Sequence, residues 1–83
     1  MQRFFFHIIH SDHRVEDPEG ALFPSLAAAH EEATATLCDL IADVMTIGEA
    51  SGLMAIDIAD EDSVVLERIV IDQAIGKILV MLR

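Results

Sequence analysis

Residues 2–9 read Gln-Arg-Phe-Phe-Phe-His-Ile-Ile, and this run of aromatic and β-branched side chains predicts a β-strand. Alternate side chains of a strand point to opposite faces. One face would carry Phe4, Phe6 and Ile8, and the other would carry Phe5, His7 and Ile9. Both faces are largely apolar, which is typical of a strand inside a sheet rather than at its exposed edge. We therefore expect the other elements to assemble around this strand.

The next segment predicts a turn and a short second strand. Asp17-Pro18-Glu19-Gly20 has the residues that a type I turn favours, with Asp first, Pro second and Gly fourth. A short strand, either around residues 14–16 or just past Gly20, would pair with the first strand.

A long helix is the strongest element of the sequence. Apolar residues recur at steps of three and four, which makes one continuous apolar stripe. The stripe consists of Leu26, Ala29, Ala33, Leu37, Leu40, Ile41 and Val44. Ser25 can cap the helix, because its hydroxyl can accept a hydrogen bond from a free N–H group of the first turn. Gly48 is a natural stop. The acidic residues of the segment lie off the stripe.

The second half of the chain predicts a hairpin and a C-terminal helix. Strands over Leu53–Ala59 and Val64–Ile71 flank the acidic turn at residues 60–63. Apolar residues then recur at helical spacing, with Asp72 as the cap of the helix. They are Ile71, Ala74, Ile75, Ile78, Leu79 and Leu82. Pairing of residues 77–82 as a strand is the alternative.

These elements predict a single α+β domain over residues 1–83. Its antiparallel sheet would have the order β-β-α-β-β, with one long helix packed on it and a C-terminal helix.

The opening Arg3-Phe4-Phe5-Phe6-His7 resembles the start of a family of short bacterial proteins, which begin with Arg, three aromatic residues and His. The likeness spans roughly residues 1–66. It includes the turn that ends in Gly20, the helix start at Pro24-Ser25-Leu26 and the acidic hairpin at 60–62. Members usually carry Asp where Ser25 stands and Gly where Ser63 stands. The family is known only as a domain of unknown function, so the resemblance implies a β-β-α-β-β order and no particular activity.

Charge and hydropathy exclude several classes of protein. Fifteen Asp and Glu residues against five Lys and Arg residues leave a formal charge of −10, whereas nucleic-acid binding needs clustered cations. Since 53% of the residues are apolar, the chain is too hydrophobic for an acidic disordered tail. The apolar runs at Phe4–Phe6 and Ile78–Leu82 are too short for a signal peptide or a membrane span. We expect a cytoplasmic protein that binds neither nucleic acid nor membrane.

The candidate metal site is the weakest pattern in the chain. His10-Ser11-Asp12-His13, with Asp17 and Glu19 nearby, offers imidazoles and carboxylates in one loop, and a transition metal needs three or four such groups. A solvated hairpin tip explains the same residues. The acidic run that starts at Asp57 does not match a calcium-binding EF-hand loop, which requires Gly at its sixth position and Glu at its twelfth.

No residue of the chain has the setting of a catalytic group. The single cysteine, Cys38, allows no intramolecular disulfide, and it lies in mid-helix beside Asp39 without a base or cation to activate it. His7 lies between apolar neighbours, which favours a buried, hydrogen-bonded histidine or one at an interface. We expect no catalytic residue, no cofactor and no enzyme.

The leading hypothesis is a non-enzymatic module that self-associates and binds other proteins. One helix cannot cover both apolar faces of a sheet, so some apolar area must be covered by another chain or by the C-terminal segment. The candidate interface consists of Phe5, His7, Ile9, Ile75, Ile78, Leu79 and Leu82. Two alternatives remain: an antitoxin-like or nucleic-acid-mimicking partner of a basic protein, and a metal-binding protein that uses histidines and carboxylates.

Overall fold

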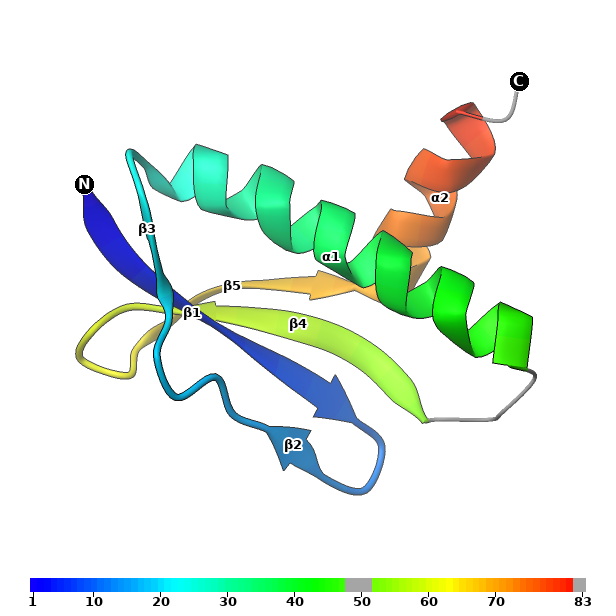
Figure 1. Ribbon diagram of the computed structural model, residues 1–83, viewed down its shortest axis with the longest axis horizontal. Helices are drawn as coiled ribbons and strands as arrows, with labels where there is room; N and C mark the ends of the chain where they lie inside the picture. The colour runs from blue at the N-terminus through cyan, green and yellow to red at the C-terminus, as the bar shows by residue number, and fades with distance from the viewer. Residues whose placement is uncertain (48–51, 82–83) are drawn as a thin grey trace.

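The computed structural model describes the backbone of residues 1–47 and 52–81, and the side chains of residues 1–46 and 52–76. The elements, in chain order, are β1 (Gln2–His10), β2 (Arg14–Val15), β3 (Ala21–Phe23), α1 (Leu26–Ile47), β4 (Leu53–Ala59), β5 (Val65–Val70) and α2 (Ile71–Met81) (Figure 1). This arrangement confirms the α+β class, the antiparallel sheet, the long helix and the C-terminal helix.

Strand β1 lies inside the sheet, as its two apolar faces predict. The strand order is β2-β1-β4-β5, and β3 also pairs with β1. All of these pairs are antiparallel. The outer edge of β1 is shared: β2 pairs at Ile8 and Ile9, and β3 pairs at residues 2–4. Both places proposed for a short second strand are therefore strands, which adds one strand before the helix to the predicted order.

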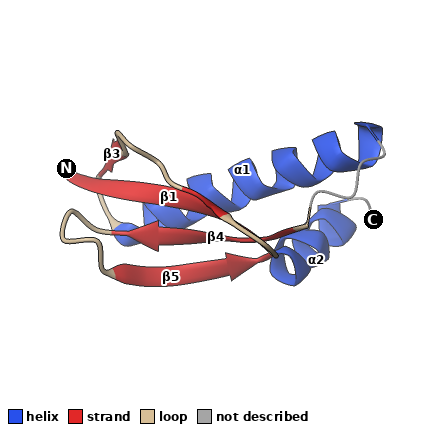
Figure 2. Cartoon of the chain, turned by 90° about the horizontal axis from the view of Figure 1, so that it is seen from below, coloured by secondary structure: helices blue, strands red, loops and turns tan. Residues whose placement is uncertain are grey.

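The core lies between α1 and one face of the sheet. The alanines of the helical stripe, Ala29 and Ala33, are fully buried together with Leu37. They pack on a sheet layer that contains Phe4, Ile56, Ile58 and Ile69. Small side chains let the helix approach the strands closely, while the larger residues fill the space at its flanks. Figure 2 shows α1 running behind β1 and β4.

The start of α2 differs from the prediction. Asp72 was expected to cap this helix, but the helix begins at Ile71, directly after β5. The side chain of Gln73 accepts a hydrogen bond from the N–H of Val70 at 3.3 Å, so Gln73 satisfies the exposed donor at the junction. Asp72 instead lies in the first turn, where its charge favours the positive end of the helix. The buried Ala74 joins the same core as α1.

The predicted cap at Ser25 and the predicted turn at residues 17–20 are both present in the structure. The Ser25 hydroxyl accepts a hydrogen bond from the N–H of Ala28 at 3.2 Å. Gly20 has a φ of +67°, and a Cβ there would lie 2.7 Å from the carbonyl oxygen of Phe4. This position therefore needs glycine both for its backbone conformation and for the close approach of β1. The predicted stop at Gly48 lies outside the described residues.

Candidate functional site

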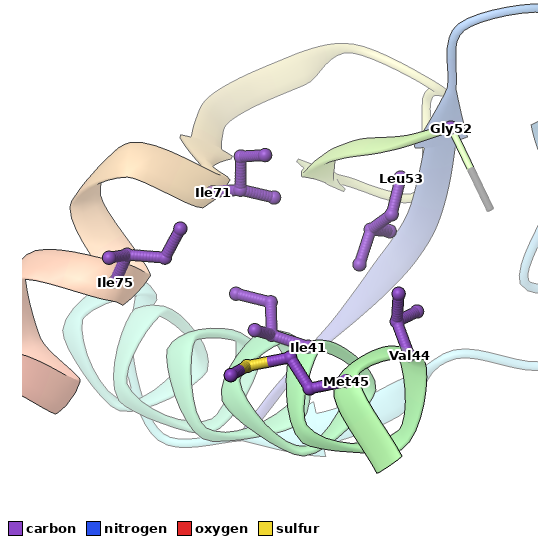
Figure 3. Close-up of a pocket in the computed structure, with 7 residues that line it drawn as sticks. All are labelled: Ile41, Val44, Met45, Gly52, Leu53, Ile71 and Ile75. Carbon is purple, nitrogen blue, oxygen red and sulfur yellow. The ribbon is translucent and has the colours of Figure 1, made fainter. Parts of the chain in front are cut away.

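An all-apolar hollow opens where the end of α1, the start of β4 and the first turns of α2 meet (Figure 3). Its volume is about 210 Å³. We call it the apolar hollow, and its lining consists of Ile41, Val44, Met45, Gly52, Leu53, Ile71 and Ile75. These residues surround one shared space, to which Gly52 contributes only backbone (Figure 3).

Helical spacing and strand register together build the hollow. Val44 and Met45 lie three and four residues after Ile41 on α1, so they flank the same side of the helix. Ile75 likewise lies four residues after Ile71 on α2. Leu53 joins them from β4 and packs against the core. The pairing of β1 with β4 shifts between Ile9 and His10, and such a shift changes which side chains face a given side of the sheet.

The side chains that line the hollow suit contact with an apolar group. No polar or charged side chain lines it among the described residues. At its rim, Met45 is 78% exposed and Ile75 is 39% exposed. An exposed, concave apolar surface on a small domain is a candidate interaction site. The side chains described around the hollow include no metal ligand and no acid, base or nucleophile.

The opposite face of the sheet, which we call the open face, carries Phe5, His7, Ile9, Asp57 and Arg68. In register, His7 lies opposite Asp57, and Asp57 lies opposite Arg68. Arg68 donates to Asp57 through Nε at 2.6 Å and through Nη2 at 2.9 Å. Asp57 is only 1% exposed, whereas the Arg68 side chain is 54% exposed. The hydrogen bond and the charge of Asp57 raise the pKa of Arg68 above its ordinary value.

The hydrogen bond that His7 accepts defines the tautomer of its neutral ring. Its Nδ1 accepts a hydrogen bond from the backbone N–H of Asp17 at 3.1 Å. A backbone N–H can only donate, so Nδ1 carries no proton and the proton of the neutral ring is on Nε2. The ring also stacks with Phe5 at a centroid distance of 6.4 Å. A metal-bound histidine donates through its second nitrogen, so this arrangement does not suit a metal at His7.

The Asp17 carboxylate binds the turn that follows it and the edge of β1. It accepts hydrogen bonds from the backbone N–H groups of Phe6, Glu19 and Gly20, at 3.2, 3.3 and 3.1 Å. Partial burial would by itself raise the pKa of Asp17, but these donors outweigh it and hold the pKa below 3.8. The sequence indicates a turn here but not its bonds to β1, because those depend on where β1 lies.

The predicted interface residues fall on two separate surfaces. Phe5, His7 and Ile9 belong to the open face, whereas Ile75 lines the apolar hollow on the helical side of the sheet. The side chains of Ile78 and Leu79, and the whole of Leu82, lie outside the described part of the chain. The helical stripe already contained Ile41 and Val44, but it did not indicate that they end in a hollow, since that depends on where α2 packs.

The residues of the predicted metal loop make contacts with one another. The rings of His10 and His13 stack at 4.3 Å, and Asp12 Oδ1 lies 2.6 Å from His13 Nδ1. This hydrogen bond and the neighbouring charge lower the pKa of Asp12. Within residues 1–47 and 52–81, no three His, Cys, Asp or Glu residues converge as a metal site would require. Cys38 packs against the core, with Sγ 3.9 Å from the carbonyl oxygen of Ala74.

The fold and the hollow define a small α+β domain, with two helices on one face of a five-stranded antiparallel sheet. The chain belongs to the family described as a domain of unknown function (DUF6894), which matches residues 3–72. The match takes in every strand, α1 and the start of α2. No curated protein and no solved structure is significantly similar to the chain. None of the helices described here is long and apolar enough to cross a membrane.

Proposed function

We propose that this protein is a non-enzymatic interaction module that forms a homodimer through the apolar hollow. The observation that carries the proposal is the exposure of Met45 and Ile75 at the rim of a concavity with an entirely apolar lining. Leaving such a surface in water is unfavourable, and a partner that removes it from water stabilises both molecules.

A second copy of the chain is the occupant that fits. The apolar spacing of α2 continues in the sequence beyond Ile75, through Ile78, Leu79 and Leu82. In Figure 1 the C-terminal end of α2 extends past α1. A two-fold axis beside α2 would place this continuation of each chain against the hollow of the other, so that the same patch serves both subunits.

The charge of the chain also favours contact at this place. Each copy carries a formal charge of −10, so two copies repel one another over most of their surface. The lining of the hollow contributes no charge. Burying ~600 Å² of apolar area per chain would stabilise a dimer by about 15 kcal/mol, against an association cost of about 4–15 kcal/mol. An interface of that area would offset the association cost over this range.

Light scattering coupled to size exclusion tests the proposal. At tens of micromolar protein we expect a mass twice that of the 9.1 kDa chain. Ile75→Asp places a charge at the rim of the hollow and should return the mass to that of a monomer. Because Ile75 is partly exposed in the monomer, the variant should keep its circular dichroism spectrum.

Val64→Asp is the matched control. Val64 is an exposed aliphatic residue of the β4–β5 connection, outside the lining of the hollow, so this variant should remain a dimer. A monomeric mass for the unmodified chain at every concentration, or equal effects of the two substitutions, would contradict the proposal.

A further inference from the structure

We propose that a second cavity, on the open face, binds a neutral, hydroxyl-rich small molecule of about one sugar ring. The cavity measures about 280 Å³. It is formed by β1, the segment around Asp17 and the hairpin turn at residues 60–63. Its volume is at the small end of the range of ligand pockets. Because it lies across the sheet from the apolar hollow, this proposal is independent of the proposed dimer.

His7 supplies a hydrogen-bond donor that the protein leaves unused. The residue is only 7% exposed, and Asp17 occupies its Nδ1. The proton is therefore on Nε2, which has no acceptor among the residues that the structure describes. No polar side-chain atom of those residues is both fully enclosed and unpaired, so Nε2 keeps some exposed surface, and His7 is one of the residues that line the cavity. A bound oxygen atom would satisfy this donor.

The charges around the cavity exclude an anion. Four carboxylates and one guanidinium line it, and they belong to Glu16, Asp17, Asp60, Glu61 and Arg14. Their formal sum is negative, so a carboxylate or phosphate ligand would meet net repulsion. The ligand atom at His7 should therefore be an uncharged oxygen.

Glu61 offers hydrogen-bond acceptors to the same ligand. Asp17 is occupied by backbone N–H groups. Oδ1 of Asp60 accepts from Asp62 and Val64. Glu61 is exposed and makes no hydrogen bond within the described ranges, so both of its oxygens can accept. A hydroxyl both donates and accepts. A ligand with several hydroxyls can thus bind Nε2 of His7 and the carboxylate of Glu61 together.

Phe5 adds an apolar surface to the cavity. Its ring is half-buried and stacks with His7 at an interplanar angle of 12°. Pockets of this kind combine an apolar wall with a few placed polar groups. The carbon face of a sugar ring or cyclitol can pack on Phe5 while its hydroxyls reach the polar groups.

Titration followed by NMR of the imidazole nitrogens tests the inference on the full chain. The probes are three neutral polyols, namely D-glucose, D-ribose and myo-inositol, together with the anion glucuronate and the diamine putrescine. We expect at least one neutral polyol to shift the His7 Nε2 resonance saturably, with millimolar affinity. Glucuronate should bind about tenfold more weakly than glucose. The negative lining would attract putrescine, but an ammonium group cannot accept a hydrogen bond, so putrescine should leave the Nε2 resonance unchanged.

Two substitutions locate the binding. His7→Phe keeps a ring but removes the donor, and Glu61→Ala removes an exposed acceptor that makes no contact needed for folding. Each should weaken polyol binding about tenfold, as expected for the loss of one hydrogen bond. Glu32→Ala, on the exposed side of α1, is the control and should leave affinity unchanged. The inference is wrong if no neutral polyol shifts His7, if putrescine shifts it instead, or if Glu61→Ala binds as tightly as Glu32→Ala.

Discussion

Asp17 is the residue that ties the irregular segment between β2 and β3 to the sheet. Its carboxylate accepts from Phe6 of β1 and from two residues of its own turn, and its N–H donates to His7. The N–H of Phe6 faces an edge that neither β2 nor β3 covers. One side chain thus takes the place of a missing strand pair, which satisfies a backbone donor that would otherwise lack a protein partner.

Asp17→Asn should reveal this role, because its effect on the free energy of unfolding should depend on pH. The folded-state pKa of Asp17 is lowered, so its stabilising effect is full above the ordinary value of 3.8 and is lost as the pH falls through the folded value. At neutral pH the variant should be less stable by about 1 kcal/mol, a modest loss because the carboxylate is partly solvated.

Urea unfolding across a pH series measures this difference. The gap between Asp17→Asn and the parent should close well below pH 3.8. A gap of the same size at neutral and at strongly acidic pH would show that the charge is not responsible. Glu31→Gln, on the exposed side of α1, should be as stable as the parent at every pH.

Ser63 adopts a backbone conformation that suits glycine. Its φ is +64°, and left-handed conformations are unfavourable for residues that have a Cβ. Ser63→Gly should stabilise the domain by about 0.5–1 kcal/mol, since relief of strain exceeds the added flexibility of the unfolded chain. Thermal unfolding measures the change. Ser63→Ala keeps the Cβ and should give no gain, so an equal rise in Tm for both variants would exclude backbone strain as the cause.

At the scale of elements, β4 is the most enclosed strand. Its residues from Ala55 to Ala59 are all buried, because β1 and β5 flank it and α1 packs on one face. Asp57 is the one charged residue in this stretch, and it depends on the neighbouring strand for its partner, Arg68.

The two members of this pair should respond unequally to substitution. Arg68→Leu leaves a buried carboxylate without its cation, whereas Asp57→Asn leaves an exposed guanidinium that water can solvate. Chemical denaturation should therefore rank Arg68→Leu as the more destabilising change. Adding Asp57→Asn to Arg68→Leu should restore part of the lost stability. If the double variant is less stable than either single variant, the uncompensated charge is not the cause.

At the scale of the whole molecule, the arginines among the described residues gather on one side of the sheet, where Glu16, Asp17, Asp60 and Glu61 also lie. By alternation and register, Arg3, Arg14 and Arg68 share the side of the sheet that carries no helix. The outer side of α1 exposes further acidic residues, namely Glu31, Glu32, Asp39 and Asp43. A dimer joined at the apolar hollow must overcome repulsion between two acidic chains.

Salt should therefore strengthen the proposed dimer. Raising NaCl from about 0.1 M to about 1 M shortens the screening length from ~10 Å to ~3 Å, which reduces the repulsion between copies. Sedimentation should show a lower dissociation constant at the higher salt concentration. An interface held by salt bridges would weaken instead, as would binding to a basic partner.

The sequence by itself determined the elements whose signal is local. Alternation in β1, the three- and four-residue stripe of α1 and the capping hydroxyl of Ser25 depend only on neighbouring residues, and each agrees with the structure. The C-terminal helix was predicted in the same way, from the spacing of Ile71 and Ile75.

The tertiary structure alone decided the contacts between distant segments. Asp57 meets Arg68 because β4 and β5 pair in one register, and Asp17 reaches Phe6 and His7 because β2 and β3 leave a gap along β1. The apolar hollow exists because α2 packs against the end of α1. Local periodicity states which side of an element is apolar, but not which segment lies opposite. Which segment lies opposite depends on how the strands pair and how the helices pack.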